Sequence, residues 1–259
     1  MNQLPLLIEG MAKRTGTKVA QTGPGYRHCE GKFLITANVF NRVFFIKLEQ
    51  YGTGTVIDVD GKQYLVTALH LLGENYEIQE LAYFHANEWK ILPIEIVGIA
   101  RTGADVAVFA TNITLCPAAL PLGVGSQGMV MSQDLYFLGF PYTLSTDGGD
   151  ALQGRPCPFI RKGIWSSAYD DGTGNPKIYI DAINNKGFSG GPIVFQASGN
   201  PGFSVAGIVS GYRTDTEDVI CEEGEQTGWT VVANTGLTIG YDIHEAVKLI
   251  LRNPIGHPL

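Results

Sequence analysis

The sequence predicts an all-β protein, built as a barrel or a sandwich. The chain has 259 residues, enough for one large domain or two small ones. Glycine occurs 33 times and only 17% of the residues are charged, a balance typical of compact, turn-rich β proteins. Short runs of β-branched and aromatic residues also follow one another closely from Lys32 onward, as in proteins with many short strands.

The first of these runs follow a turn-rich stretch. We expect residues 1–32 to form an N-terminal extension that starts with a short amphipathic helix. Val59-Asp60-Gly61-Lys62 lies between TVIDV and QYLVTAL, which predicts a tight β-hairpin. Further strand-like runs in this half are RVFFIKLEQ, EWKILPIEIVGIA and ADVAVFAT.

A looser Pro- and Gly-rich stretch, Thr111–Gly128, could join two halves of the chain. Short strand-like runs resume after it. Residues 214–225, TDTEDVICEEGE, are interpreted as an acidic, solvated loop. Residues 243–252 are predicted to be helical, with Asp242 as the cap and Glu245 placed as in a capping box. The strand-like runs here are MVMSQDLYFLGFP, FIRKGIWSSA, KIYIDAI, GGPIVFQA, FSVAGIVSGY, TGWTVVA and LTIGYDI.

Charge and hydropathy argue against several classes of partner. The formal net charge is −7 and no block of Lys and Arg is present, so we expect neither a nucleic-acid partner nor binding to an anionic membrane. No apolar run approaches the ~18 residues of a membrane-spanning helix. The first residues do not make a convincing signal peptide. We therefore expect a cytoplasmic protein, with export by another route left open.

The cysteines do not predict a metal site. Cys29, Cys116, Cys157 and Cys221 are widely spaced and form no CxxC pair. We expect reduced thiols and neither a metal nor any other cofactor.

One serine lies in a motif that fits three structures. GFSGGPIV, residues 187–194, could be a tight turn, the nucleophile elbow of an α/β-hydrolase, or a nucleophile loop between strands. A serine hydroxyl is a weak nucleophile and needs a base within hydrogen-bond reach. Of the five histidines, His70 stands out because it ends the apolar run YLVTALH. His28, His85 and His257 lie in turn-rich or polar segments, and His244 lies in the first turn of the predicted terminal helix.

Asp105 is the matching carboxylate. It opens the apolar run DVAVFA, so we expect it to be partly buried and to need a hydrogen-bond donor. That donor could be an imidazole N–H, a backbone group or Arg101. The order His70, Asp105, Ser189 is that of chymotrypsin-type proteins. An elbow would require a helix after the serine, whereas Pro192 and IVF read as a strand.

At this point the sequence resembles a known family. TALH (67–70), ADVAVF (104–109), KGFSGGPIV (186–194) and VAGIVSGY (205–212) together look like a trypsin-like serine peptidase of the chymotrypsin fold. DAINNKGFSGGP is similar to the bacterial HtrA-type branch, and the resemblance runs from about Arg42 to Ile243. It implies a peptidase domain over 33–259, with six-stranded antiparallel barrels at 33–117 and 128–242 and a terminal helix.

The resemblance also implies roles for individual residues. His70 would act as general base and then general acid, Asp105 would orient it, and Ser189 would attack the carbonyl. The N–H groups of Gly187 and Ser189 would form the oxyanion hole. Ser210 would hydrogen-bond Asp105, and the edge Ser210–Tyr212, which includes Gly211, would take the substrate as an added strand.

The sequence also departs from the family. Phe188 replaces the aspartate that in digestive relatives pairs with a newly cut N-terminus, so we expect no such activation switch. We also expect no PDZ domain. By family register Ile183 lies at the floor of the specificity pocket and Tyr212 on its wall, which predicts a small or medium apolar P1 residue such as Ala, Val or Leu.

The predicted activity is therefore a serine endopeptidase that acts through an acyl-enzyme on protein or peptide substrates. Two alternatives stay open: a catalytically silent binding module with the same fold, and an α/β-hydrolase esterase. The sequence does not predict the oligomeric state.

Overall fold

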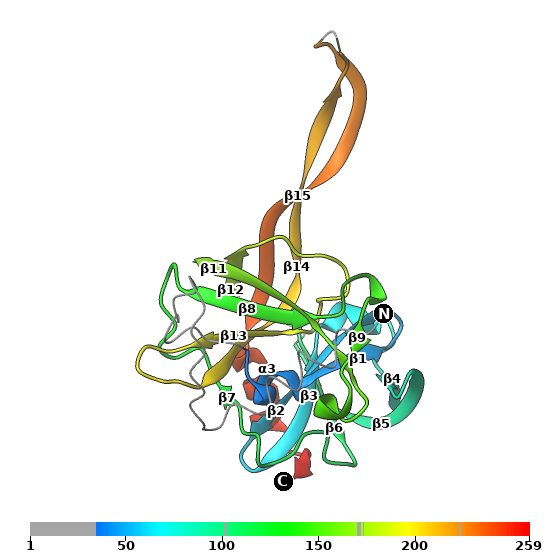
Figure 1. Cartoon of the computed structure of the whole chain (residues 1–259), viewed down its shortest axis with the longest axis vertical. Helices are drawn as coiled ribbons and strands as arrows, with labels where there is room; N and C mark the ends of the chain where they lie inside the picture. Colours follow the sequence, from blue (N-terminus) through cyan, green and yellow to red (C-terminus); the bar gives the residue numbers. More distant parts are fainter. Residues whose placement is uncertain (1–34, 101–102, 170–171, 173, 223) are drawn as a thin grey trace, which may run out of the picture.

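A computed structural model describes residues 35–259 apart from 101–102, 170–171, 173 and 223. The described chain is dominated by strands, as predicted, and a helix lies near its C-terminal end (Figure 1). The expected extension at 1–32, with its predicted helix and Cys29, lies outside the described residues. Within the described residues, no helix combines the length and apolar character needed to cross a membrane.

The first barrel consists of six antiparallel strands. They run in the order β3-β2-β1-β4-β5-β6, and β3 also pairs with β6, which closes the sheet on itself. The short helix α2 (Ala37–Phe40) precedes it, and β16 (His257–Pro258) adds to the outer edge of β3. The strands are β1 (Val43–Lys47), β2 (Tyr51–Val59), β3 (Lys62–Thr67), β4 (Glu80–His85), β5 (Glu88–Ile99) and β6 (Ala107–Thr111).

The second barrel is closed in the same way. Its strands run in the order β13-β8-β11-β12-β15-β14, and β13 also pairs with β14. β7 (Gly123–Val124) adds to β14 in parallel, and β9 (Thr146–Asp147) pairs with β10 (Pro156–Cys157) in a separate loop. The strands are β8 (Asp134–Gly139), β11 (Phe159–Tyr169), β12 (Lys177–Asp181), β13 (Pro192–Gln196), β14 (Phe203–Ile220) and β15 (Gln226–Asp242). The expected double barrel is confirmed.

Two local predictions are also confirmed. Val59 pairs with Lys62, and Asp60 and Gly61 both have positive φ, which makes the tight hairpin turn. The terminal helix α3 spans His244–Arg252. Asp242 accepts a hydrogen bond from the His244 N–H at 2.9 Å, but the N-cap is Ile243, which makes no side-chain cap hydrogen bond. Glu245 accepts from Lys248 at 2.7 Å, so the predicted capping box is wrong.

The segment at 214–225 differs from its interpretation as a loop. β14 continues to Ile220 and β15 begins at Gln226, so most of the acidic stretch is one arm of a long hairpin. This hairpin projects well beyond the barrels (Figure 1). The described residues of the stretch are exposed apart from Cys221, which is half-buried, so only the solvation was predicted correctly.

The cysteines that the structure describes are not paired. Cys116, Cys157 and Cys221 are free thiols. Burial raises the pKa of the Cys116 thiol to about 12, in spite of the nearby Arg42 and Arg155 side chains. Cys116 is therefore a neutral core residue at physiological pH, without the thiolate that reactivity requires.

The barrels share an apolar interface that one charged side chain crosses. Phe45 of β1 stacks on Phe140, which follows β8, with ring centroids 4.8 Å apart. Arg155, from the loop between β8 and β11, is buried and donates to the Asn41 backbone oxygen at 2.9 Å and to the Asn41 Oδ1 at 2.7 Å. Its guanidinium lies 4.4 Å from the centroid of Phe44. Arg155 thus fixes a loop of the second barrel to the start of the first.

Arg155→Met should reduce the free energy of unfolding by about 2–3 kcal/mol, because it leaves two buried oxygens of Asn41 with fewer donors. Chemical denaturation followed by fluorescence measures this. Lys90→Met, a change on the exposed face of β5, is the control and should alter stability little. Equal stability of the two variants would contradict the role assigned to Arg155.

Candidate active site

His70 lies just beyond the end of a barrel strand. The apolar run YLVTALH continues to His70, but β3 already ends at Thr67. His70 itself belongs to the 3-10 helix η1 (Leu69–Leu72). The buried residues Leu71 and Leu72 anchor this turn, while the His70 side chain remains 42% exposed. The ring is therefore held by rigid backbone and still reachable from solvent.

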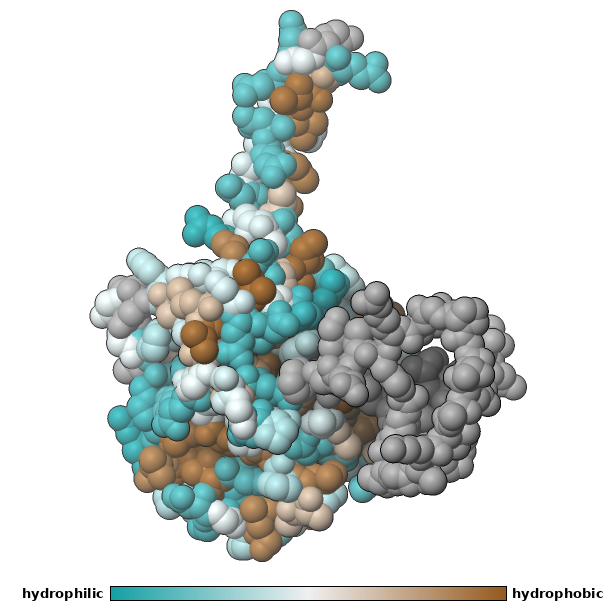
Figure 2. Space-filling model, turned by 60° about the vertical axis from the view of Figure 1, so that its left-hand side comes forward, coloured by the Kyte–Doolittle hydropathy of each residue, from teal (hydrophilic) through white to brown (hydrophobic). Residues whose placement is uncertain are grey.

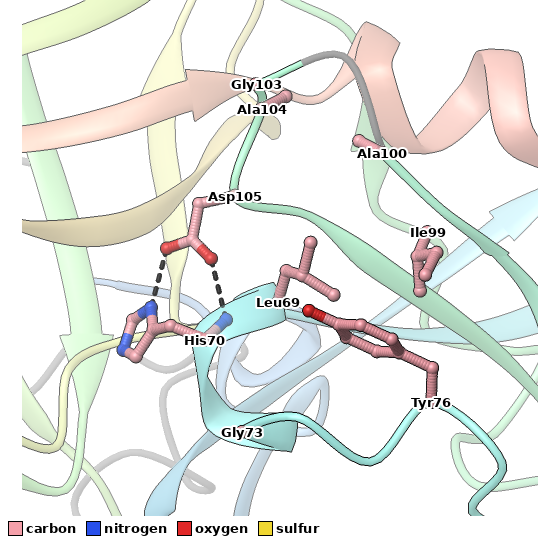
Figure 3. Close-up of a pocket in the computed structure, with 9 residues that line it drawn as sticks. All are labelled: Leu69, His70, Gly73, Tyr76, Ile99, Ala100, Gly103, Ala104 and Asp105. Carbon is pink, nitrogen blue, oxygen red and sulfur yellow. Dashed lines mark hydrogen bonds and ion pairs between the residues drawn. The ribbon is translucent and has the colours of Figure 1, made fainter.

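Asp105 holds His70 by two hydrogen bonds. Its Oδ1 accepts from the His70 backbone N–H at 2.8 Å, and its Oδ2 lies 2.6 Å from the ring Nδ1 (Figure 3). The Ser210 hydroxyl donates to the same Oδ2 at 2.6 Å, as the family resemblance implies. Because an ionised carboxylate only accepts, Nδ1 carries the hydrogen and Nε2 is left as the acceptor.

The electrostatics favour an ionised Asp105. Burial raises the pKa of its carboxyl group, but the hydrogen bonds and charge of His70, together with the hydrogen bond from Ser210, outweigh burial and lower the pKa below its usual value. Asp105 is thus a carboxylate at neutral pH and fixes the His70 tautomer without taking a proton.

Ser189 lies on a loop that the first barrel holds in place. Thr53 of β2 donates from its backbone N–H to the Ser189 backbone oxygen at 2.8 Å, and from its hydroxyl to the Gly187 oxygen at 2.7 Å. Thr55, two residues further along β2, donates to the Gly190 oxygen at 2.8 Å. The loop belongs to the second barrel, but the first barrel donates hydrogen bonds to three of its carbonyl groups, those of Gly187, Ser189 and Gly190.

Two glycines are required by the path of this loop. Gly187 has φ +104°, and a Cβ there would lie 2.1 Å from the Phe140 backbone oxygen. Gly190 has φ +83°, and a Cβ there would lie 2.0 Å from the Thr53 oxygen. Both conformations and both close approaches exclude a side chain.

The Ser189 hydroxyl does not bond to His70 in this structure. It donates instead to the Ser210 backbone oxygen at 3.0 Å. Among the described residues, no hydrogen bond joins Ser189 to the His70 ring, and none is made by the N–H groups of Gly187 and Ser189. Catalytic hydrogen bonds are often long or misaligned in ligand-free structures, so this arrangement is compatible with a resting site.

His70 and Ser189 line one cleft between the barrels. His70 also borders a second hollow beside Asp105, across which Tyr76 extends its ring (Figure 3). The cleft is lined by Glu49, Gln50, Tyr51, His70, Leu71, Tyr142, Thr143, Asn184, Asn185, Lys186, Gly187, Ser189, Ser210, Gly211 and Tyr212.

Ile183 does not lie where the family register places it. Its side chain is 54% exposed and it does not line the cleft, so its assignment to the pocket floor is wrong. The neighbouring Asn184 points inward instead, because side chains alternate along an extended segment. Asn184 is buried, donates to the Gly211 oxygen at 2.9 Å, and accepts at its backbone oxygen from Asn234 at 2.7 Å.

The sequence reasoning missed Asn184, Thr53 and Thr55. Their roles depend on contacts between segments far apart in the chain, which single-sequence patterns do not encode. The one available signal was the paired asparagines of INNKG, a polar pair that directly precedes the serine motif.

Two closed barrels with a His–Asp pair and a serine at their shared cleft define the class of chymotrypsin-like peptidases. A model of the trypsin-like peptidase domain matches residues 52–202, which is more than half of the chain. The chain therefore belongs to the trypsin-like peptidase family, and its class is serine peptidase.

Solved structures share this fold. The Rv3671c protease of M. tuberculosis H37Rv, in its inactive form, is 19% identical with a TM-score of 0.53, over 84% of this chain and 91% of that one. The HtrA-type protease AlgW with a tripeptide is 16% identical with a TM-score of 0.55, over 85% and 62%. The serine endoprotease of Yersinia pestis is 18% identical with a TM-score of 0.53, over 85% and 67%. No curated protein matches the sequence.

Thr55→Val should lower the free energy of unfolding by about 1–3 kcal/mol, since it leaves the buried Gly190 oxygen without this donor while keeping the side-chain shape. Peptidase activity should fall as well, because the Ser189 loop loses an anchor. Thr114→Val, in an exposed loop, is the control for both measurements. Unchanged stability and activity in Thr55→Val would show that the anchor is dispensable.

Proposed function

We propose that this protein is a serine endopeptidase that hydrolyses peptide bonds through an acyl-enzyme, with residues 33–259 as the catalytic domain. The observation that carries the proposal is the orientation of His70: both oxygens of Asp105 hold it, at 2.8 and 2.6 Å, on the border of the cleft that Ser189 also lines. A histidine fixed in this way presents a basic Nε2 to a nearby hydroxyl.

In the proposed reaction, Ser189 rotates from the Ser210 oxygen towards His70 Nε2. His70 takes the hydroxyl proton as Ser189 Oγ forms a bond to the scissile carbonyl carbon. The imidazolium then gives this proton to the leaving amine when the C–N bond breaks. In the second half of the reaction, His70 takes a proton from water as the water oxygen attacks the acyl carbon. The imidazolium then returns this proton to Ser189 Oγ as the ester bond breaks. Asp105 stays ionised throughout and stabilises the imidazolium.

The unpaired N–H groups of Gly187 and Ser189 are proposed to bind the oxyanion. Their lack of partners in the ligand-free site supports this role, since buried or semi-buried donors usually find an acceptor. The positive φ that Gly187 adopts helps to turn its N–H out of the loop. Such preorganised donors stabilise the negative charge that develops on the carbonyl oxygen.

The P1 residue is proposed to be apolar and small or medium in size, but for a reason other than Ile183. Asn184 ties the segment before Ser189 to β14 through the Gly211 oxygen, and Tyr212 also lines the cleft. The one carboxylate among the residues that line the cleft, Glu49, comes from the first barrel and not from the segment before Ser189. Ala, Val and Leu therefore fit better than Lys or Arg.

One observation favours a second candidate, a silent binding module. The Ser189 hydroxyl is engaged with the Ser210 oxygen rather than with His70. If that bond persisted with peptide in the cleft, the serine would remain unactivated and the cleft would only bind.

A fluorophosphonate probe should label the wild-type protein at Ser189, because the probe reacts with an activated serine hydroxyl. Ser189→Ala should not label, and Asp105→Asn should label more slowly by a factor on the order of 10³–10⁴. In-gel fluorescence with intact mass measures both. Folded wild-type protein that binds peptides, but neither labels nor cleaves them, would establish the binding module instead.

A peptide library should be cleaved mainly after Ala, Val or Leu. Tyr212→Gly should extend cleavage to larger apolar P1 residues, since it removes a side chain from the cleft wall. Mass spectrometry of the products reports both profiles. Cleavage mainly after Lys or Arg would contradict the proposed pocket.

A further inference from the structure

The projecting hairpin is a direct continuation of the cleft wall. β14 begins inside the second barrel, passes Ser189 at Ser210–Tyr212, and runs on to Ile220 as one strand. We use the term ribbon for Thr214–Ile220 of β14 together with Gln226–Asn234 of β15. The ribbon projects from the second barrel (Figure 1), and its first arm continues the strand whose Ser210 backbone oxygen accepts the hydrogen bond from Ser189.

The ribbon has an open edge along β14. Pairing of β14 with β13 ends at Ile208, opposite Pro192, whereas pairing with β15 continues out to Ile220. From Ser210 to Ile220, β15 is the only strand that pairs with β14 within the part of the chain that the structure describes. Unpaired backbone groups along a strand edge are a template for one further strand.

One face of the ribbon combines carboxylates with exposed apolar groups. Asp215 pairs with Ala233 and Glu217 with Val231, and paired residues share a face. Trp229, two residues before Val231, lies on that face by strand alternation and is 75% exposed. Hydrophobic and hydrophilic residues are both visible along the projecting hairpin (Figure 2), and Val232, on the opposite face, is exposed as well.

The negative charge of the ribbon is not balanced by basic residues within the ribbon. Between Thr214 and Asn234 the sequence contains no Lys, Arg or His. The acidic residues in this interval are Asp215, Glu217, Asp218, Glu222, Glu223 and Glu225. Arg213, just before the ribbon, is the one basic residue on the edge from Ser210 to Ile220, so beyond it an added strand would meet only acidic charge, which attracts basic segments and repels acidic ones.

We infer that the ribbon extends the substrate edge and selects extended polypeptides with Lys or Arg on the N-terminal side of the scissile bond. The inference rests on the proposed peptidase function. An antiparallel strand whose P1 residue lies opposite Ser210 runs N-terminally outward along β14. One-to-one pairing then places the residues about six and about eight positions before the scissile bond opposite Asp215 and Glu217.

The test compares peptides with one cleavable core and different N-terminal extensions. The extensions carry Lys, Gln or Glu at the positions about six and eight residues before the scissile bond. In wild-type protein, kcat/KM for the Lys peptide should exceed that for the Gln peptide by about tenfold, and the Glu peptide should be slowest. The preference should shrink at high salt, because the carboxylates are exposed.

Variants of the ribbon locate the effect. In Asp215→Asn/Glu217→Gln, the ratio of kcat/KM for the Lys peptide to that for the Gln peptide should fall to near one. Because both values come from the same variant, any general loss of activity cancels in this ratio. Glu88→Gln/Glu95→Gln, on β5 of the first barrel, removes the same charge elsewhere and should keep the wild-type ratio. Equal rates for the three peptides in wild-type protein, or a preference unchanged in Asp215→Asn/Glu217→Gln, would overturn the inference.

Binding separates this inference from the proposed function. If wild-type protein cleaves none of the peptides, the peptidase proposal fails, and fluorescence anisotropy with Ser189→Ala protein decides the role of the ribbon. Tighter binding of the Lys peptide that Asp215→Asn/Glu217→Gln abolishes supports it, and equal binding overturns it. Dimers in sedimentation that Trp229→Ser abolishes would assign the edge to a second copy of the chain, which also overturns it.

Discussion

The site depends on hydrogen bonds that cross from one barrel to the other. Thr53 and Thr55 of β2 satisfy the carbonyl groups of Gly187, Ser189 and Gly190, which belong to the second barrel. The hydrogen bond to the Gly190 oxygen is fully buried and that to the Gly187 oxygen is partly buried, so loss of these donors costs stability. The position of the serine loop is therefore fixed by the packing of the two barrels, and the cleft cannot be formed by either barrel alone.

Asp105 and His70 are also held by contacts between the two barrels. Asp105 and His70 come from the first barrel, whereas Ser210, which donates to the same carboxylate oxygen as the imidazole, comes from β14 of the second. Asp105 thus links the barrels through hydrogen bonds while it orients His70. Arg155 and the stacked pair of Phe45 and Phe140 hold the barrels together elsewhere. The geometry of the site therefore depends on how firmly the two barrels are packed.

The sequence predicted what local patterns determine. Strand texture, the hairpin at Asp60-Gly61 and the terminal helix follow from residues close together in the chain, and the order of His70, Asp105 and Ser189 indicated the class. Ile183 was misplaced because a family register does not show which of two adjacent residues faces inward. The ribbon was missed because its acidic arm has the composition of a loop, and only pairing with the apolar residues of β15 makes it a strand.

The open edge of the ribbon has a consequence for its order. A two-stranded hairpin without a covering layer is marginally stable in water, whereas three strands with an apolar face can hold together. In the part of the chain that the structure describes, the ribbon has two strands outside the barrel, so its backbone amides should exchange with solvent far faster than those of the barrels. A third strand added along β14 would complete a small sheet around Trp229 and Val231. Binding of a third strand along β14 should therefore stabilise the ribbon and slow the exchange of its backbone amides.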